Sequence, residues 1–326
     1  MLSGHYSMGV SNVVRARLTV RATGLLAGAV LAACAALTAP APAASAAPVA
    51  SAAPVASAAP AASAAPSAAG PGGVGAESAA IENAATGALL WSRGLNTERP
   101  MASITKVMTA LVVIRAGDLD RNITIPSAVV AYVREWGASN AGLRPGDRLT
   151  AGQLLDGLLL PSGSDAAYAL AEAYGPGIPA FITKMNATAR LLGMTRTHFS
   201  NFDGLPWPTP YSNYSTAANL LTLGRVAMRS PLFRWIVDQR SYWLAAGQGH
   251  HAYLWRNLNP LLGHYPGAIG IKPGYTGAAG LCLLFEATRK GYSLIGVTLD
   301  SPGSITSVNG TDAIRMLNWA FGLRAA

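Results

Sequence analysis

The sequence contains few of the residues that build disulfide frameworks and metal clusters. Only two of its 326 residues are cysteine and five are histidine. Cys282 lies in the apolar run 281–284, which predicts a core strand with an inert thiol, and no cysteine or histidine cluster has the spacing of metal ligands. We therefore expect no disulfide framework, no metal and no cofactor.

Acidic residues are also scarce, and none precedes Glu77. After residues 1–76 are set aside, 21 basic residues face 15 acidic ones, a net charge of +6. The basic residues are scattered rather than clustered, so the sequence predicts no nucleic-acid partner, although the modest positive charge suits an anionic cell envelope.

The N-terminal segment has the pattern of a secretory signal. Three arginines within 15–21 precede the apolar stretch 25–31, which is too short to be a convincing membrane span, and small residues follow. Residues 1–46 are therefore predicted to be a signal peptide. Two outcomes stay open: cleavage after Ala46, or lipidation of Cys34, because residues 31–34 resemble a bacterial lipobox.

A low-complexity stretch follows the signal. Residues 47–76 contain no charged or aromatic residue, and most of them repeat a hexad that begins Ser-Ala-Ala-Pro. This pattern predicts a semi-extended linker ahead of a folded domain over 77–326. We expect an exported protein at the cell wall or the outer face of the membrane. The only predicted link to the membrane is the lipid at Cys34.

The hydrophobic pattern after residue 77 predicts strands at both ends of the domain and helices between them. The predicted strands are 78–83, 87–92, 269–275, 280–287 and 292–299, and the predicted helices are 103–114, 151–160, 166–174, 178–192, 217–228, 231–237 and 311–321. This order favours an α/β fold, in which an antiparallel sheet is flanked by helices and carries an inserted helical subdomain.

The first candidate site lies at the start of the helix predicted at 103–114. Ser103 and Lys106 are three residues apart, so their side chains are neighbours on the first helical turn. A hydroxyl, an amine and the free N–H groups of a helix start are a nucleophile, a possible base and an oxyanion site. The alternative is that Ser103 only caps the helix.

A second candidate cluster is the loop Ser162-Gly163-Ser164 between two predicted helices. Serine and glycine are common in turns, and Ser164 is also a suitable cap for the next helix. The loop alone therefore does not decide between a functional and a structural role.

The third cluster is a predicted strand that contains Lys272, Gly274 and Thr276 on one face. The missing side chain of Gly274 leaves room between a cation and a hydroxyl, which suits a carboxylate. Pro273 places this strand at a sheet edge, where a peptide substrate can pair with it and where the N–H of Tyr275 can face the substrate.

The three clusters together resemble the S-x-x-K, S-x-N and K-T-G motifs of penicillin-binding proteins and serine β-lactamases. The surrounding residues resemble most closely the low-molecular-mass serine-type D-alanyl-D-alanine carboxypeptidases, from about Ser78 to Phe321. The supporting stretches are 161–167, 185–186, 192–194, 197–199, 203–205, 214–217 and 270–280. Two positions depart from the family pattern: Ser164 stands where the family has Asn, and Pro273 where it has Thr.

The resemblance implies removal of the terminal D-Ala from peptidoglycan stem peptides. It implies Ser103 as nucleophile, Lys106 as base and Ser162 as proton shuttle, with β-lactams as covalent inhibitors of Ser103. It further implies substrate binding by Ser164, Lys272, Gly274, Tyr275 and Thr276, with the Ser103 and Tyr275 N–H groups as the oxyanion hole.

Four other functions are alternatives to a carboxypeptidase. A D,D-endopeptidase acting on cross-links would use the same residues. A class A β-lactamase is disfavoured because Glu172 is the only Glu between Ser164 and Lys272. A non-catalytic peptidoglycan-binding module would fit the two departures but not the retained Ser103 and Lys106. A Ser-His-Asp hydrolase is disfavoured by the absence of a G-x-S-x-G motif.

Overall fold

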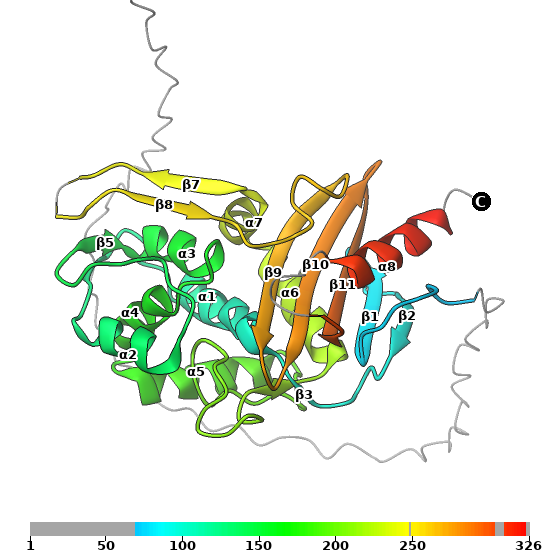
Figure 1. Ribbon diagram of the computed structural model, residues 1–326, viewed down its shortest axis with the longest axis horizontal. Helices are drawn as coiled ribbons and strands as arrows, with labels where there is room; N and C mark the ends of the chain where they lie inside the picture. The colour runs from blue at the N-terminus through cyan, green and yellow to red at the C-terminus, as the bar shows by residue number, and fades with distance from the viewer. Residues whose placement is uncertain (1–68, 248, 304–309, 324–326) are drawn as a thin grey trace, which may run out of the picture. The chain divides into compact units, whose positions relative to one another are not determined.

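A five-stranded antiparallel sheet organises the protein in the computed structural model, which describes residues 69–247, 249–303 and 310–323. The strand order is β2-β1-β11-β10-β9, so strands from both ends of the chain pair in the middle of the sheet (Figure 1). The strands are β1 (Ser78–Asn83), β2 (Leu89–Arg93), β9 (Ala268–Thr276), β10 (Gly280–Arg289) and β11 (Tyr292–Ser301). β9 lies at one edge, as Pro273 predicted.

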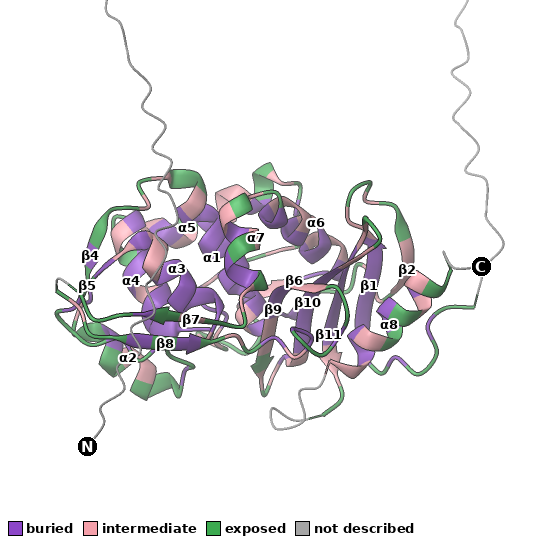
Figure 2. Ribbon diagram, turned by 90° about the horizontal axis from the view of Figure 1, so that it is seen from above, coloured by how far each residue is buried: buried purple, intermediate pink, exposed green. Residues whose placement is uncertain are grey.

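Helices cover both faces of this sheet and form a group beside β9 (Figures 1 and 2). α8 packs on β1, β10 and β11 from one face, and α6 packs on the same strands from the other. The helices are η1 (Ala102–Ile104, a 3-10 turn), α1 (Thr105–Ala116), α2 (Ala128–Trp136), α3 (Ala151–Leu159), α4 (Ser164–Tyr174), α5 (Ile178–Leu191), α6 (Ala217–Met228), α7 (Pro231–Asp238) and α8 (Thr311–Gly322).

The alternation of side chains along β10 explains why two cores form. Leu284 belongs to the larger core, shared with the helices α1 to α7, whereas Leu283 and Phe285 belong to the smaller core under α8. Gly296 on the neighbouring strand makes room for Phe285, since a Cβ there would overlap the Phe285 ring. Residues 282–285 of this strand form a continuous apolar run because both faces of the strand are buried there.

Three two-stranded ribbons complete the described chain. They are β3 (Arg99–Pro100) with β6 (Tyr214–Ser215), β4 (Asn122–Thr124) with β5 (Arg148–Thr150), and β7 (Ser241–Leu244) with β8 (Tyr253–Arg256). The β3–β6 pair holds the chain immediately before η1, which carries Ser103.

The predicted fold class is confirmed, and every predicted strand and helix is present with small shifts at its ends. α3 begins with a capping box, in which Gln153 N–H donates to Thr150 Oγ1 (3.1 Å) and Thr150 N–H donates to Gln153 Oε1 (2.8 Å). The sequence did not predict α2 or the β7–β8 ribbon. α2 has one fully buried residue, Val129.

The end of the predicted linker lies against the domain. Val74 and Ala76 are buried in the smaller core, and Gly75 N–H donates to Asp312 Oδ1 on α8 (2.9 Å). Trp319 Nε1–H donates to Ala69 O (2.7 Å). The last residues of the predicted linker therefore pack against α8 and the smaller core.

The predicted signal peptide, Cys34 and residues 47–68 of the predicted linker lie outside the described residues. Within the described ranges, no helix has the length and apolar character needed to cross a membrane.

Candidate active site

The three predicted clusters meet in one cleft of about 730 Å³ beside the β9 edge. All eight predicted site residues line it: Ser103, Lys106, Ser162, Ser164, Lys272, Gly274, Tyr275 and Thr276. The clusters come from η1 and α1, from the loop before α4, and from β9. Segments separated by more than 160 residues in the sequence therefore share one surface.

Ser103 and Lys106 lie at the junction between η1 and α1. Lys106 Nζ donates to Ser103 Oγ (3.1 Å) and to the backbone oxygen of Asp203 (3.0 Å). Neither η1 nor α1 has a side-chain cap, so the interpretation of Ser103 as a capping residue is wrong. The 3-10 turn instead presents Ser103 Oγ to the amine.

Burial controls the charge of the two lysines in the cleft. Lys106 is 1% exposed, and its burial lowers its pKa, while the carboxylates of Asp203 and Asp165 act in the opposite direction. Lys272 is fully buried, and its pKa is lowered well below the ordinary value by burial and then by the charge of Lys106. Two buried ammonium groups disfavour each other, so the cleft favours a neutral amine.

The loop before α4 aims two hydroxyls into the cleft. Ser162 and Ser164 are buried, and the Oγ atom of each has no hydrogen-bond partner among the described residues. Ser162 adopts a positive φ of 63°, a conformation that costs about 1–3 kcal/mol and that the surrounding structure must hold. Ser164 is the first residue of α4 and Gly163 is its N-cap, so the capping interpretation of Ser164 is wrong as well.

A segment that the sequence analysis missed holds this loop in place. Ser139 Oγ–H donates to Ser162 O (2.7 Å), and Ser164 N–H donates to Ser139 O (2.8 Å). The buried Asp165 carboxylate accepts from Ala141 N–H (2.8 Å) and from Leu143 N–H (2.9 Å). Nothing in the local sequence pairs residues 139–143 with 162–165, because their contacts join segments more than 20 residues apart.

The β9 edge forms the opposite wall. A Cβ on Gly274 would lie 2.9 Å from Ser103 N, so the strand passes directly against the backbone of the nucleophile turn. Lys272 Nζ donates to Pro273 O (3.2 Å). Thr276 Oγ1 accepts from Ala279 N–H (3.1 Å), which leaves the Thr276 hydroxyl proton available to a ligand.

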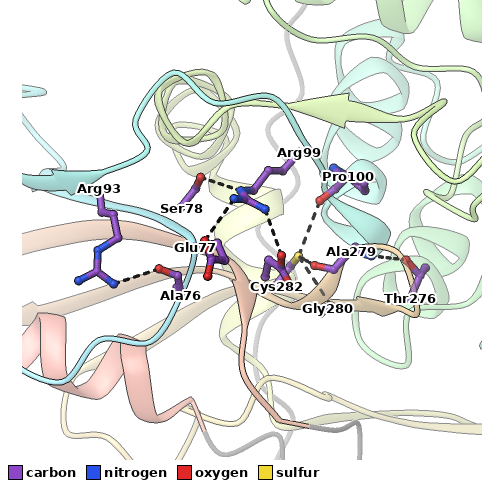
Figure 3. A network of polar contacts seen from close by, with 11 residues as sticks. Ala76, Glu77, Ser78, Arg93, Arg99, Pro100, Thr276, Ala279, Gly280 and Cys282 are labelled. Carbon is purple, nitrogen blue, oxygen red and sulfur yellow. Dashed lines mark hydrogen bonds and ion pairs between the residues drawn. The ribbon is translucent and has the colours of Figure 1, made fainter.

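Polar contacts behind the cleft fix the chain that leads into Ser103 (Figure 3). Arg99 donates to Ser78 Oγ (3.0 Å) and to Asp300 Oδ2 (3.0 Å). Cys282 lies below Pro100, and its thiol donates to Ala279 O (3.4 Å). Burial raises the pKa of Cys282 to about 12, so the thiol stays protonated, in agreement with the inert thiol predicted from sequence.

The geometry defines a class of protein. A serine and a buried lysine at the start of a helix, a serine loop and a lysine-bearing edge strand, on an antiparallel sheet with helices on both faces, are the fold and site of penicillin-binding proteins and serine β-lactamases. The described residues contain no cluster of three or more His, Cys, Asp or Glu side chains able to hold a metal ion.

Comparison with known proteins identifies the family within this class. The model of the D-alanyl-D-alanine carboxypeptidase family matches residues 63–303, so the chain belongs to this family of serine peptidases, as its motifs predicted.

The chain is 40% identical over 255 residues to the D-alanyl-D-alanine carboxypeptidase of Streptomyces sp. strain K15, covering 74% of this chain and 85% of that protein. It is 39% identical over 220 residues to D-alanyl-D-alanine carboxypeptidase DacB2 of Mycobacterium tuberculosis, covering 68% of this chain and 73% of that protein. The crystal structure of the Streptomyces K15 DD-transpeptidase matches with a TM-score of 0.71 at 39% identity, over 76% of this chain and 98% of that one. More distant relatives, 31% and 30% identical, are named D-alanyl-D-alanine endopeptidase.

Proposed function

We propose that the protein is a serine D-alanyl-D-alanine carboxypeptidase, which removes the terminal D-Ala from peptidoglycan stem peptides through an acyl-enzyme on Ser103. The observation that carries this proposal is the 3.1 Å contact between Ser103 Oγ and the buried amine of Lys106, in a cleft that Lys272 also lines. Family membership supports the same reaction.

Lys106 acts as the base for acylation. Its neutral amine takes the proton of the Ser103 hydroxyl while Oγ attacks the penultimate carbonyl carbon. The C–N bond to the terminal D-Ala breaks, and the proton reaches the leaving amine through the unpartnered hydroxyl of Ser162. An ordinary lysine has a pKa near 10.4, so the lowering by burial is what makes the base usable.

The backbone stabilises the tetrahedral intermediate. The N–H groups of Ser103 and Tyr275 donate to the oxyanion, and losing one such donor typically costs about 10²–10³ in rate. The close passage of Gly274 against Ser103 N supports this assignment, because Tyr275 follows Gly274 directly in β9.

Lys272 and Thr276 bind the terminal carboxylate of the substrate. A carboxylate beside Lys272 supplies the counter-charge that the free cleft lacks, so substrate binding raises the pKa of Lys272. Ser164 and Gly274 complete the substrate site. Pro273 contributes no hydroxyl, so Thr276 makes the contact that the family pattern assigns to Thr at the earlier position.

A water molecule then hydrolyses the acyl-enzyme, with Lys106 again as base. No carboxylate lines the described cleft, and Glu172 is exposed on α4 outside it. The cleft therefore lacks the Glu that class A β-lactamases use for deacylation, and penicillins form long-lived adducts on Ser103.

Residues 1–46 serve as an export signal and the hexad repeat as a linker, which place the domain outside the cytoplasm. The arginines, the apolar stretch and the location of the peptidoglycan substrate support this assignment. Cleavage after Ala46 and lipidation of Cys34 remain the two forms of the mature N-terminus, and mass spectrometry of the exported protein distinguishes them.

The test is mass spectrometry of the purified protein after penicillin treatment, with D-Ala release from a stem pentapeptide followed in parallel. We expect an adduct on Ser103 together with D-Ala release. An adduct with cleavage only of cross-linked dimers would favour the endopeptidase, the name that two relatives carry. The absence of both adduct and release would indicate a non-catalytic binding module.

A further inference from the structure

The cleft has a large uncharged part that the proposed chemistry does not use. Its lining there includes Trp136, Gly137, Ala138, Leu205, Pro206 and Leu258. Lys106 and Lys272 are the only charged side chains that line the described cleft. Trp136 and Leu258 are 40% and 52% exposed, so both offer apolar surface to a ligand in the cleft.

Trp136 is fixed to the catalytic centre by a chain of contacts. Its ring stacks on Trp207 with centroids 5.8 Å apart and an interplanar angle of 25°. Trp207 Nε1–H donates to the Tyr132 hydroxyl (3.3 Å), which donates to Asp203 Oδ2 (3.0 Å). The backbone oxygen of Asp203 is the acceptor for Lys106. The aromatic wall is therefore a built part of the site.

Charge and space determine what can bind this wall. The substrate carboxylate lies at Lys272 and the scissile carbonyl at Ser103, so the residue before the D-Ala pair must lie in the remaining, uncharged part. A free ammonium there would find no carboxylate among the side chains that line the described cleft. One partly exposed ring face offers only a weak cation–π contact in return. A neutral acylated amine can instead pack its carbon atoms on Trp136 and Leu258.

We propose that Trp136, supported by Leu258, is a specificity-determining residue that binds the side chain preceding the D-Ala pair and selects neutral, N-acylated side chains over those that end in a free ammonium. This inference rests on the carboxypeptidase function proposed above. The favoured substrates are stem peptides whose side-chain amine is already joined in an amide bond.

The test compares kcat/KM for D-Ala release from two peptides, Nα-acetyl-L-Lys-D-Ala-D-Ala and the same peptide acetylated also at Nε. We expect a preference of about tenfold or more for the diacetyl peptide in the unmodified protein. Trp136→Ala should lower this ratio to about two or less, and Trp136→Phe should retain most of it. Trp243→Ala is the matched control, since Trp243 is 62% exposed on β7 and does not line the cleft.

Leu258→Glu provides a second test that leaves the Trp136–Trp207 stack intact. A carboxylate at this exposed position should favour the free ammonium and bring the ratio below one. Equal or reversed kcat/KM values in the unmodified protein would overturn this inference but not the proposed function. An unchanged ratio in both Trp136→Ala and Leu258→Glu would do the same. Absence of D-Ala release from both peptides, together with absence of penicillin labelling of Ser103, would overturn the proposed function and this inference with it.

Discussion

The contact between β9 and the nucleophile turn can be tested by adding a single methyl group. In Gly274→Ala the new Cβ would lie 2.9 Å from Ser103 N and 3.2 Å from Met101 O, whereas ordinary contacts begin at 3.4 Å. Both neighbours are backbone atoms, which cannot rotate away. The backbone of Gly274 lies outside the left-handed region, so the substitution acts through this contact and not through φ. β9 must therefore move away from Ser103 by about half an ångström.

Such a displacement widens the oxyanion hole. A misplacement of about 1 Å can cost 10²-fold in rate, so we expect penicillin acylation of Ser103 to slow about ten- to hundredfold, with a loss of about 1–3 kcal/mol in the free energy of unfolding. The assay is the second-order rate constant for labelling by a fluorescent penicillin, with thermal unfolding measured on the same samples. Gly322→Ala adds the same methyl group where no atom lies within 4 Å, so it should leave the labelling rate unchanged and should not lower stability. A folded Gly274→Ala protein that labels at the full rate would refute the geometry.

Three further predictions follow from buried groups. Ser103→Ala should abolish penicillin labelling, and Lys106→Arg should slow it by orders of magnitude because arginine does not deprotonate; normal labelling of a folded Lys106→Arg protein would exclude Lys106 as the base. Because burial lowers the pKa of Lys106, the acylation rate should rise with pH through a single deprotonation below the ordinary lysine value of about 10.4, and a flat profile from about pH 5 to 10 would contradict this assignment. Burial raises the pKa of Asp156 to about 7, whereas this carboxyl ionises near pH 4 in the unfolded chain, so the free energy of unfolding falls as the pH rises from about 4 to 7. Asp156→Asn should therefore stabilise the protein by up to about 4 kcal/mol at pH 8 and hardly at pH 4. Equal changes in Tm at both pH values would contradict this assignment.

The part of the site that could be predicted from sequence is the part whose chemistry depends on local spacing. Ser103 and Lys106 are adjacent because they are three residues apart at a helix start, and β9 lies at an edge because Pro273 cannot donate to a ladder. Short apolar runs bounded by turns likewise located the five strands of the sheet.

The residues that were missed act through contacts between distant segments. Ser139 and Asp165 tie two distant segments together by hydrogen bonds, and Trp136 is held by a stack on the distant Trp207, so no local motif marks them. The capping interpretations of Ser103 and Ser164 failed for a related reason. Local propensity favours serine at a helix start, but tertiary contacts turned both hydroxyls toward the cleft.

The docking of residues 69–76 on α8 has a practical consequence for labelling or immobilising this enzyme. The chain joins the domain at β1, and two strands, β11 and β10, separate β1 from the β9 edge, a span of about 14 Å at the usual strand spacing. A dye, a bead or a fusion partner joined through residue 69 would therefore be attached on the α8 side of the sheet. Immobilised in this way, the protein would keep the β9 edge open to a polymeric cell-wall substrate as well as to a small peptide.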